Sequence, residues 1–427
     1  MKYYIETYGC QMNVADSELI ISILNSAGHT AVTDIEQADL LLFNTCSVRA
    51  HAEQRVLGRI SNEKHRKKHN PQLKIALLGC MAQRIGKSLL KTDSGIDYVI
   101  GVDQYDKLPA MLAAEEHCSL LLDFNSAQVY QDLMPTHQNK TCGFVTIMRG
   151  CNNFCSYCIV PHVRGRERSR PWKDIVSDVQ SAVAQGLKDI TLLGQNVNSY
   201  HDGELDFPML LKRLNGTNGL ERLRFITSHP KDLSDSLIEV MANSDKVCEH
   251  IHLAMQSGND RILAKMNRNY TAKHFLSLVY KLRKAMPEIG VTTDIICGFP
   301  SESVSEFADT LAIMREIRFD YAFCYKYSPR EGTAAALYED QIPEAIRLSR
   351  LQSMIDLQHS ITLEKYSAMI GQTVEVYVED FSRKSAAQVS GKTRDFKIAV
   401  LSGDASDIGK LKKATVIKAS AGTLICP

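Results

Sequence analysis

Three short strand-like runs near the start of the chain each end on a cysteine. The runs KYYIETYGC, DLLLFNTC and KIALLGC end at Cys10, Cys46 and Cys80, so the cysteines are 36 and 34 residues apart. Helical stretches, predicted over residues 16–27 and 50–68, separate the runs. This spacing is typical of successive strand–helix–strand units, and it predicts an α/β domain built on a parallel sheet.

We expect the three cysteines to meet at one edge of that sheet. Ligands of an open parallel sheet bind beyond the carboxyl ends of its strands. A lone buried cysteine is often just a small apolar side chain, and that interpretation stays open for each of the three taken singly. Three thiols at equivalent strand ends favour a metal site.

A second cysteine trio follows a strand predicted over residues 144–148. Cys151, Cys155 and Cys158 form a CxxxCxxC motif in the stretch GFVTIMRGCNNFCSYCIVPH. Thiolates this close would repel one another unless a cation neutralised them. A structural zinc site requires four nitrogen or sulfur ligands, and His162 could supply the fourth, so zinc remains an alternative. Three ligands favour an iron–sulfur cluster whose remaining iron stays open to a substrate or cofactor.

The motif resembles that of the radical S-adenosylmethionine (SAM) superfamily. In that superfamily the open iron binds the amino and carboxylate groups of SAM, and an electron from the cluster cleaves SAM to a 5′-deoxyadenosyl radical. The resemblance implies that Tyr157 lies near the adenine of SAM, with plain packing as the alternative for this side chain.

The chain after the motif alternates strands and helices. Further strands are predicted over residues 189–193, 222–227, 247–255, 290–297 and 321–327. Six strands favour an open, partial β/α barrel over a closed eight-stranded one, and barrel active sites lie at the carboxyl ends of the strands. Gln195, Ser228 and Gln256 are therefore candidate SAM contacts, although polar loop residues are often merely solvated.

Two basic regions are candidates for contacts with RNA. Arg166 and Arg168, in a track of arginines from Arg164 to Arg170, follow the cluster motif and could hold phosphates or form an ordinary solvated loop. Residues 369–427 alternate apolar and polar positions, which predicts a small antiparallel β-barrel. This tail has nine Lys or Arg against six Asp or Glu, a net charge of +3. It could bind RNA or serve as a packing module.

The overall composition limits which partners and which cellular location the protein can have. A chain of 427 residues with a net charge of +1 has no global attraction for nucleic acid or membranes. The sequence shows no apolar signal segment and no run long enough to span a bilayer, so we expect a cytoplasmic protein that does not enter the membrane. In that compartment the twelve cysteines are expected to be metal ligands, catalytic groups or core residues rather than disulfides. The predicted domains are 1–118, a linker 119–140, the barrel 141–340, a helical connector 341–368 and the tail 369–427.

The order of these parts resembles the radical SAM methylthiotransferases from end to end. That family has an N-terminal domain with three cysteines, a radical SAM barrel and a C-terminal TRAM domain that touches RNA. Within it, the chain is most similar to the MiaB branch. The stretches that carry this likeness are YGCQMN at 8–13, NTCSVR at 44–49 and LLGQNVNSY at 192–200.

The resemblance implies both the cofactors and the reaction. Cys151, Cys155 and Cys158 would hold the 4Fe-4S cluster that binds SAM, and Cys10, Cys46 and Cys80 a second, auxiliary 4Fe-4S cluster that supplies sulfur. One SAM would methylate a sulfur and a second would give the radical that activates carbon 2 of isopentenyl-adenosine, next to the anticodon of tRNA. Catalysis would rest on the cofactors, with no catalytic side chain.

The same resemblance implies the partners and leaves alternatives. The RNA partner would be the anticodon stem-loop of tRNA, and an electron-donor protein and a sulfur source are required as well. Related branches act on threonylcarbamoyl-adenosine in tRNA or on a ribosomal protein. A non-catalytic RNA-binding protein with structural metal sites is the alternative of another class.

Overall fold

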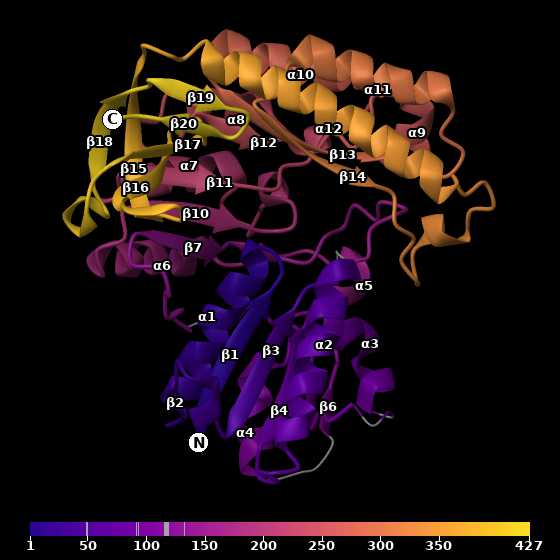
Figure 1. Cartoon of the computed structure of the whole chain (residues 1–427), viewed down its shortest axis with the longest axis vertical. Helices are drawn as coiled ribbons and strands as arrows, with labels where there is room; N and C mark the ends of the chain where they lie inside the picture. Colours follow the sequence, from indigo (N-terminus) through magenta and orange to yellow (C-terminus); the bar gives the residue numbers. More distant parts are fainter. Residues whose placement is uncertain (48–49, 91, 93, 115–118, 132) are drawn as a thin grey trace.

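The computed structural model describes the whole chain except residues 48–49, 91, 93, 115–118 and 132. Two details of the sequence predictions therefore lie outside the described residues: the last two positions of NTCSVR and the domain boundary at residue 118. Figure 1 shows three parts, with an N-terminal sheet domain below, a barrel above it and a small C-terminal sheet against the barrel.

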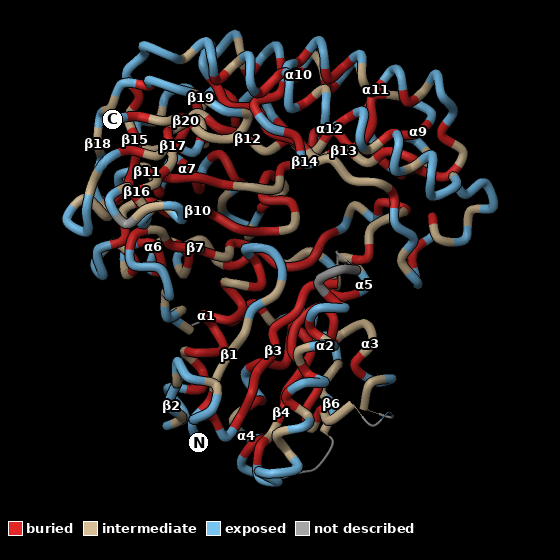
Figure 2. The backbone as a smooth tube through the Cα atoms, in the orientation of Figure 1, coloured by how far each residue is buried: buried red, intermediate tan, exposed pale blue. Residues whose placement is uncertain are grey.

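The N-terminal domain is a six-stranded sheet in which every neighbouring pair is parallel, as predicted. All six residues of the second long strand, LLLFNT, are buried, because helices cover both faces of the sheet. Figure 2 shows this buried layer running through the domain. In spatial order the strands are β2 (Thr30–Ala31), β1 (Lys2–Tyr8), β3 (Leu40–Thr45), β4 (Lys74–Gly79), β5 (Tyr98–Ile100) and β6 (Ser119–Leu121). The helices are α1 (Gln11–Ser26), α2 (Ala50–Arg66), α3 (Cys80–Leu90) and α4 (Leu108–Ala113).

The middle of the chain forms the predicted partial β/α barrel with six parallel strands. β7 (Cys142–Thr146), β10 (Asp189–Leu193) and β11 (Arg222–Phe225) make one sheet, and β12 (His250–His252), β13 (Gly290–Cys297) and β14 (Tyr321–Lys326) make the other. Parallel bridges from Leu223 to Val247 and from Ser228 to Leu253 join the two sheets. Among the described residues no pairing joins β14 back to β7, so the barrel is open.

Helices cover the outer face of the barrel. Leu192 of β10 and Val291 of β13 belong to one apolar core with residues of these helices. The helices are α6 (Trp172–Ala184), α7 (Phe207–Asn215), α8 (Asp235–Ala242), α9 (Asp260–Lys265), α10 (Ala272–Ala285), α11 (Val304–Ile317) and α12 (Glu344–Ser367). The cluster motif is flanked by β8 (Met148–Arg149), α5 (Val160–Arg164) and β9 (Arg168–Ser169). No helix among the described residues is long and apolar enough to cross a bilayer.

The C-terminal part is a curled six-stranded sheet. The prediction of a purely antiparallel barrel was wrong in one respect, because β17 pairs with β20 in parallel. In the sequence β18 and β19 lie between these two strands, so their parallel pairing depends on a crossover connection. The alternation of apolar and polar residues does not reveal such a connection. In spatial order the strands are β18 (Leu411–Thr415), β15 (Thr373–Ser382), β16 (Ser385–Thr393), β17 (Ile398–Ser402), β20 (Thr423–Ile425) and β19 (Lys418–Ser420).

This C-terminal sheet is docked on the amino ends of the barrel strands. Buried Arg222 donates to the backbone oxygen of Lys392 (2.6 Å), and buried Arg224 donates to that of Thr393 (2.9 Å). The rings of His250 and Phe396 stack with centroids 4.4 Å apart. The sheet thereby leaves the opposite end of the barrel, where the strands finish, facing the N-terminal domain.

Candidate active site

The CxxxCxxC loop carries its three sulfurs beside nitrogen donors. Asn153 donates to Cys151 Sγ from its backbone nitrogen (3.5 Å) and its side-chain amide (3.4 Å), and Arg268 Nη1 donates to Cys155 Sγ (3.5 Å). Burial, followed by the charge of Cys155, raises the pKa of Cys158 to about 12. Thiolates at these positions therefore need a bound cation, while the nitrogen donors suit sulfurs that carry negative charge.

Two of the candidate SAM contacts carry buried polar atoms that lack a partner in the described part of the chain. Ser228 Oγ and Gln256 Oε1 are buried, and neither has a hydrogen-bond partner among the described residues. Gln256 also has a φ of +67°, a strained conformation that is common where a side chain must be aimed at a ligand. Buried polar atoms without partners fit a site that a polar ligand completes.

The other two candidates already have contacts within the protein. Gln195 Oε1 accepts a hydrogen bond of 2.5 Å from the backbone nitrogen of Gly150, so Gln195 positions the start of the cluster loop. Tyr157 packs in an apolar cluster with Met266 and Phe299. Its ring is half-buried there, and this packing interaction was the alternative interpretation for Tyr157.

The N-terminal trio gathers at the upper edge of its sheet. Cys10 precedes α1, Cys46 follows β3 and Cys80 begins α3. A hydrogen bond from the Cys46 thiol, together with the charge of Arg164, lowers the pKa of Cys10 to about 6 although burial opposes the shift. Arg164 Nε donates to Cys80 Sγ (3.2 Å). The structure thus brings the three cysteines together.

Arg164 also joins the two cysteine trios, because it lies in α5, just after the CxxxCxxC motif. Its Nη2 donates to Asp16 Oδ2 (2.7 Å), and Arg149 Nη2 donates to Asp16 Oδ1 (2.8 Å). Burial alone would raise the pKa of Asp16, but the two guanidinium groups lower it below its usual value. The side chain of Asp16 is fully buried, so this triad fixes the N-terminal domain against the barrel.

Sequence reasoning missed this triad. Arg164 was noted only as part of the basic track, and Asp16 was placed in a helix without a role. The partners are more than a hundred residues apart along the chain, and no local pattern signals such a pair.

Comparison with known proteins agrees with this arrangement of parts. Residues 2–101 match the uncharacterized protein family UPF0004, residues 145–314 the radical SAM superfamily and residues 367–425 the TRAM domain. The tRNA-2-methylthio-N(6)-dimethylallyladenosine synthase of Thermoanaerobacter sp. (strain X514) is 45% identical over 430 residues, which cover 99% of this chain and 91% of that protein. The chain belongs to this synthase family.

Another member of the synthase family, from Clostridium novyi (strain NT), is 44% identical and aligns with 99% of this chain and 95% of its own length. Membership of the radical SAM superfamily implies a 4Fe-4S cluster and SAM, and the donors to the sulfurs of Cys151 and Cys155 fit the cluster.

Solved structures of more distant proteins share the fold. The radical SAM methyltransferase TsrM from Kitasatospora setae aligns with a TM-score of 0.58 and 14% identity, over 76% of this chain and 72% of its own. The cobalamin-dependent SAM radical enzyme OxsB aligns with a TM-score of 0.56 and 10% identity, over 84% of this chain and 56% of its own.

The two predicted RNA-binding arginines have different surroundings. Arg166 is exposed and its guanidinium lies 4.2 Å from the centroid of the Phe154 ring. Arg168 is instead bound to both carboxylate oxygens of Asp103, at 2.7 and 3.0 Å, and its side chain is 9% exposed. Arg166 therefore has a solvent-facing charge, whereas the charge of Arg168 is neutralised within the synthase fold.

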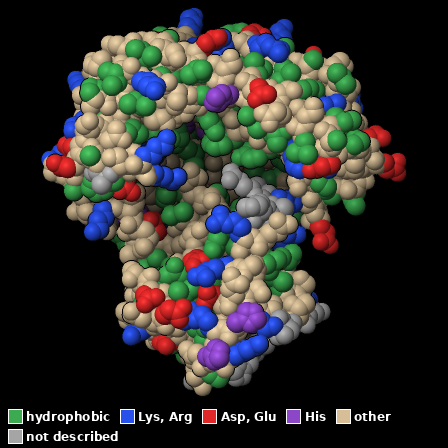
Figure 3. All heavy atoms as spheres, viewed as in Figure 1, with side chains coloured by type: hydrophobic (Ala, Val, Ile, Leu, Met, Phe, Trp, Pro, Cys, Tyr) green, Lys and Arg blue, Asp and Glu red, His purple; other side chains and the backbone are tan. Residues whose placement is uncertain are grey.

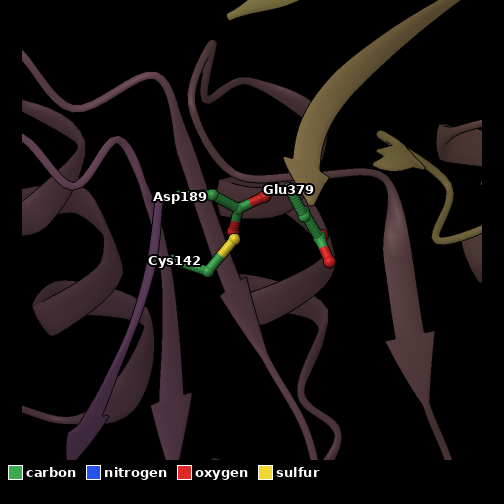
Figure 4. A group of neighbouring side chains, drawn as sticks. All are labelled: Cys142, Asp189 and Glu379. Atoms are coloured by element: carbon green, nitrogen blue, oxygen red, sulfur yellow. The ribbon is translucent and has the colours of Figure 1, made fainter. Parts of the chain in front are cut away.

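One further group of possible metal ligands lies at the other end of the barrel. Cys142, Asp189 and Glu379 bring ligand atoms within 4.8 Å of one another, from β7, β10 and β15 (Figure 4). Asp189 is paired with Arg224 (2.9 Å) and Glu379 with Lys392 (2.7 Å). Both carboxylates thus already have cationic partners, and the group belongs to the interface between the barrel and the C-terminal sheet.

Proposed function

We propose that this protein adds a methylthio group to carbon 2 of N6-isopentenyl-adenosine next to the anticodon of tRNA, in the cytoplasm. The likeness to the synthase family over nearly the whole chain supports the reaction. The observation that carries the proposal is the position of Arg164, which binds Cys80 of one trio from α5, the helix that follows the other trio. Two cysteine sets at one domain junction suit a reaction that needs both a radical and a sulfur donor.

The barrel would hold the first cluster and SAM. Bound to Cys151, Cys155 and Cys158, the cluster supplies the electron for reductive cleavage of SAM. Asn153 and Arg268 donate to the cysteine sulfurs, which stabilises their negative charge. Ser228 Oγ and Gln256 Oε1 would bind polar groups of SAM, and Tyr157 would form an apolar wall beside it.

The N-terminal trio would hold the auxiliary cluster. Cys10, Cys46 and Cys80 provide three sulfurs for four irons, and so one iron is left open for sulfur exchange. Arg164 would hold Cys80 in place through its N–H group and, with Arg149, give this region a net positive charge beside Asp16. Repeated turnover then requires a sulfur source and an electron-donor protein.

The anticodon stem-loop would be held by exposed cations and by the TRAM domain. Arg166, stacked on Phe154 beside the cluster loop, is the arginine whose charge faces solvent. The C-terminal sheet adds a local net charge of +3 from residues 369–427. A loop is the form of RNA from which a base is turned out at least cost.

The direct test is a reaction with a synthetic RNA. The anaerobically reconstituted protein, supplied with SAM and a reductant, is incubated with an anticodon stem-loop containing N6-isopentenyl-adenosine, and the nucleosides are analysed by mass spectrometry. We expect 2-methylthio product and about eight irons per chain, as two four-iron clusters require. Cleavage of SAM without methylthio product, or a colourless zinc protein, would refute the proposal.

A further inference from the structure

The second half of the barrel presents an uncovered inner wall. Along β12, β13 and β14 alternate side chains point to the helices and to the barrel interior. Those that face the helices are buried in the apolar core, among them Ile251, Val291, Ile295 and Ala322. The intervening residues face inward. We call His252, Thr292, Asp294, Tyr321 and Phe323 the open wall.

Two aromatic residues make part of the open wall accessible. Tyr321 is 42% exposed and Phe323 40% exposed, and their rings meet edge to face with centroids 4.9 Å apart. The Phe323 ring also lies 5.9 Å from the ring of His252. Two large aromatic side chains that point into a barrel and remain exposed are an unusual use of apolar surface, and such surfaces commonly mark a ligand site.

This wall continues along its strands toward their carboxyl ends, where the cluster site lies. Phe323 pairs with Asp294, and two residues further along the same strands Tyr325 pairs with Ile296. Ile296 packs in the apolar cluster that contains Tyr157, which precedes Cys158 of the CxxxCxxC motif. A ligand group on the open wall would therefore lie next to the place where SAM is expected to bind. Figure 3 shows that the molecule is hollowed between its upper and lower parts on the face drawn there.

The charge of the wall is negative. Asp294 Oδ2 lies 3.2 Å from His252 Nε2, and His252 Nδ1 lies 3.1 Å from Thr292 Oγ1. Lys326 is the only Lys or Arg in β12, β13 and β14, and its amine bonds to Glu344 of α12. Arg330, beyond β14, interacts with Glu53 of the N-terminal domain instead. An anionic ligand on this wall would meet the carboxylate of Asp294, while Lys326 and Arg330 are already engaged with other carboxylates.

We propose that the open wall binds the neutral, apolar N6 substituent of the target adenine and rejects an anionic one. This inference rests on the proposed function and names what distinguishes its substrate. The isopentenyl group would pack on Tyr321 and Phe323. A threonylcarbamoyl group carries a carboxylate, which Asp294 would repel, so selection combines an apolar surface with a repulsive charge.

Kinetics with two stem-loops test this assignment. One RNA contains N6-isopentenyl-adenosine and the other N6-threonylcarbamoyl-adenosine, and both are given to the reconstituted full-length protein. Phe323→Ala should raise the KM for the isopentenyl RNA roughly tenfold, as for loss of one apolar contact in a substrate pocket, and leave SAM cleavage without RNA unchanged. Phe323→Leu, which keeps an apolar side chain, should restore most of that loss. Asp294→Asn, which keeps a hydrogen bond to His252, should reduce the preference for the neutral RNA by on the order of tenfold.

A matched control is available on the outside of the barrel. Tyr280 is 50% exposed on α10, and Tyr280→Ala should change neither KM nor preference. An unchanged KM for Phe323→Ala together with an unchanged preference for Asp294→Asn would overturn the inference while leaving the proposed function intact. Equal use of both RNAs by the wild type would do the same. A wild type that cleaves SAM but modifies neither RNA would instead contradict the proposed function.

Discussion

The two halves of the barrel share one architecture but differ in what covers their inner faces. In the first half, Phe144, Leu193 and Ile226 pack against Met12 and Ala15, at the start of α1 in the N-terminal domain. In the second half, Tyr321 and Phe323 remain exposed on the inner wall. The N-terminal domain thus covers the inner face of the first half of the barrel. The gap between β14 and β7 leaves the inner face of the second half open.

Under the proposed function, this difference would separate the chemistry from the recognition of the substrate. The covered half meets the domain that carries Cys10, Cys46 and Cys80, and the buried triad around Asp16 fixes that contact. A buried, ion-paired junction would hold the two cysteine trios at a fixed separation. The open half can admit a large substrate without moving this junction, because no residue of the triad comes from β12, β13 or β14.

The largest expected effect comes from removing single cysteines at the junction. Cys151→Ala should abolish both SAM cleavage and methylthiolation, whereas Cys80→Ala should abolish methylthiolation and spare SAM cleavage. Each variant should lose about four of eight irons. Iron analysis with assays of both reactions checks this, and Cys324→Ala, whose thiol is not part of either trio, serves as the control. Methylthio product from Cys80→Ala would show that the N-terminal trio is not needed.

The next effect concerns the buried triad. Asp16→Asn removes the carboxylate that pairs with both Arg149 and Arg164, so two buried cations lose their partner. We expect the free energy of unfolding to fall by about 3–5 kcal/mol, measured by urea denaturation. The exposed pair of Lys281 and Asp235 is the matched control, and Asp235→Asn should cost less than about 1 kcal/mol. Equal costs would mean that the junction is not stabilised by this triad.

A pH effect compares one histidine from each half. Burial lowers the pKa of His229, after β11, to about 2, and it lowers the pKa of His250, in β12, well below its usual value. Both stay neutral in the folded protein while the unfolded chain binds protons below about pH 6.5, so stability falls as the pH falls. Each should contribute a slope approaching about 1.4 kcal/mol per pH unit below pH 6.

Urea denaturation between pH 7 and pH 5 measures these slopes. His229→Gln and His250→Gln should each flatten the pH dependence, by similar amounts. A variant with an unchanged slope would show that its histidine is protonated in the folded state.

The smallest effect concerns RNA affinity at the surface. Arg166→Ala should weaken binding of the stem-loop several-fold and reduce the slope of log affinity against log salt by about one. Arg168→Ala should lower stability, since it breaks the pair with Asp103, and leave the salt slope unchanged. Binding titrations at several salt concentrations distinguish the two, and a changed slope for Arg168→Ala alone would reverse these roles.

The sequence predicted the parts of this protein better than their contacts. The three strands that end on cysteines and the six barrel strands follow from local apolar patterns, which depend on neighbouring residues. The triad around Asp16, the pairing of Arg168 with Asp103 and the parallel pair of β17 and β20 depend on distant segments. The run YAFCYK is recognisable as a strand, but only the open barrel explains why Tyr321 and Phe323 are exposed.

Electron paramagnetic resonance of the anaerobically reduced, reconstituted protein tests the central claim most directly, because neighbouring paramagnetic clusters broaden each other's signals. If the two cysteine trios hold clusters that share one chamber, the wild type should show two cluster signals with mutual spin coupling, and Cys80→Ala should show one uncoupled signal. Two uncoupled signals in the wild type, or a wild-type spectrum identical to that of Cys80→Ala, would contradict the account.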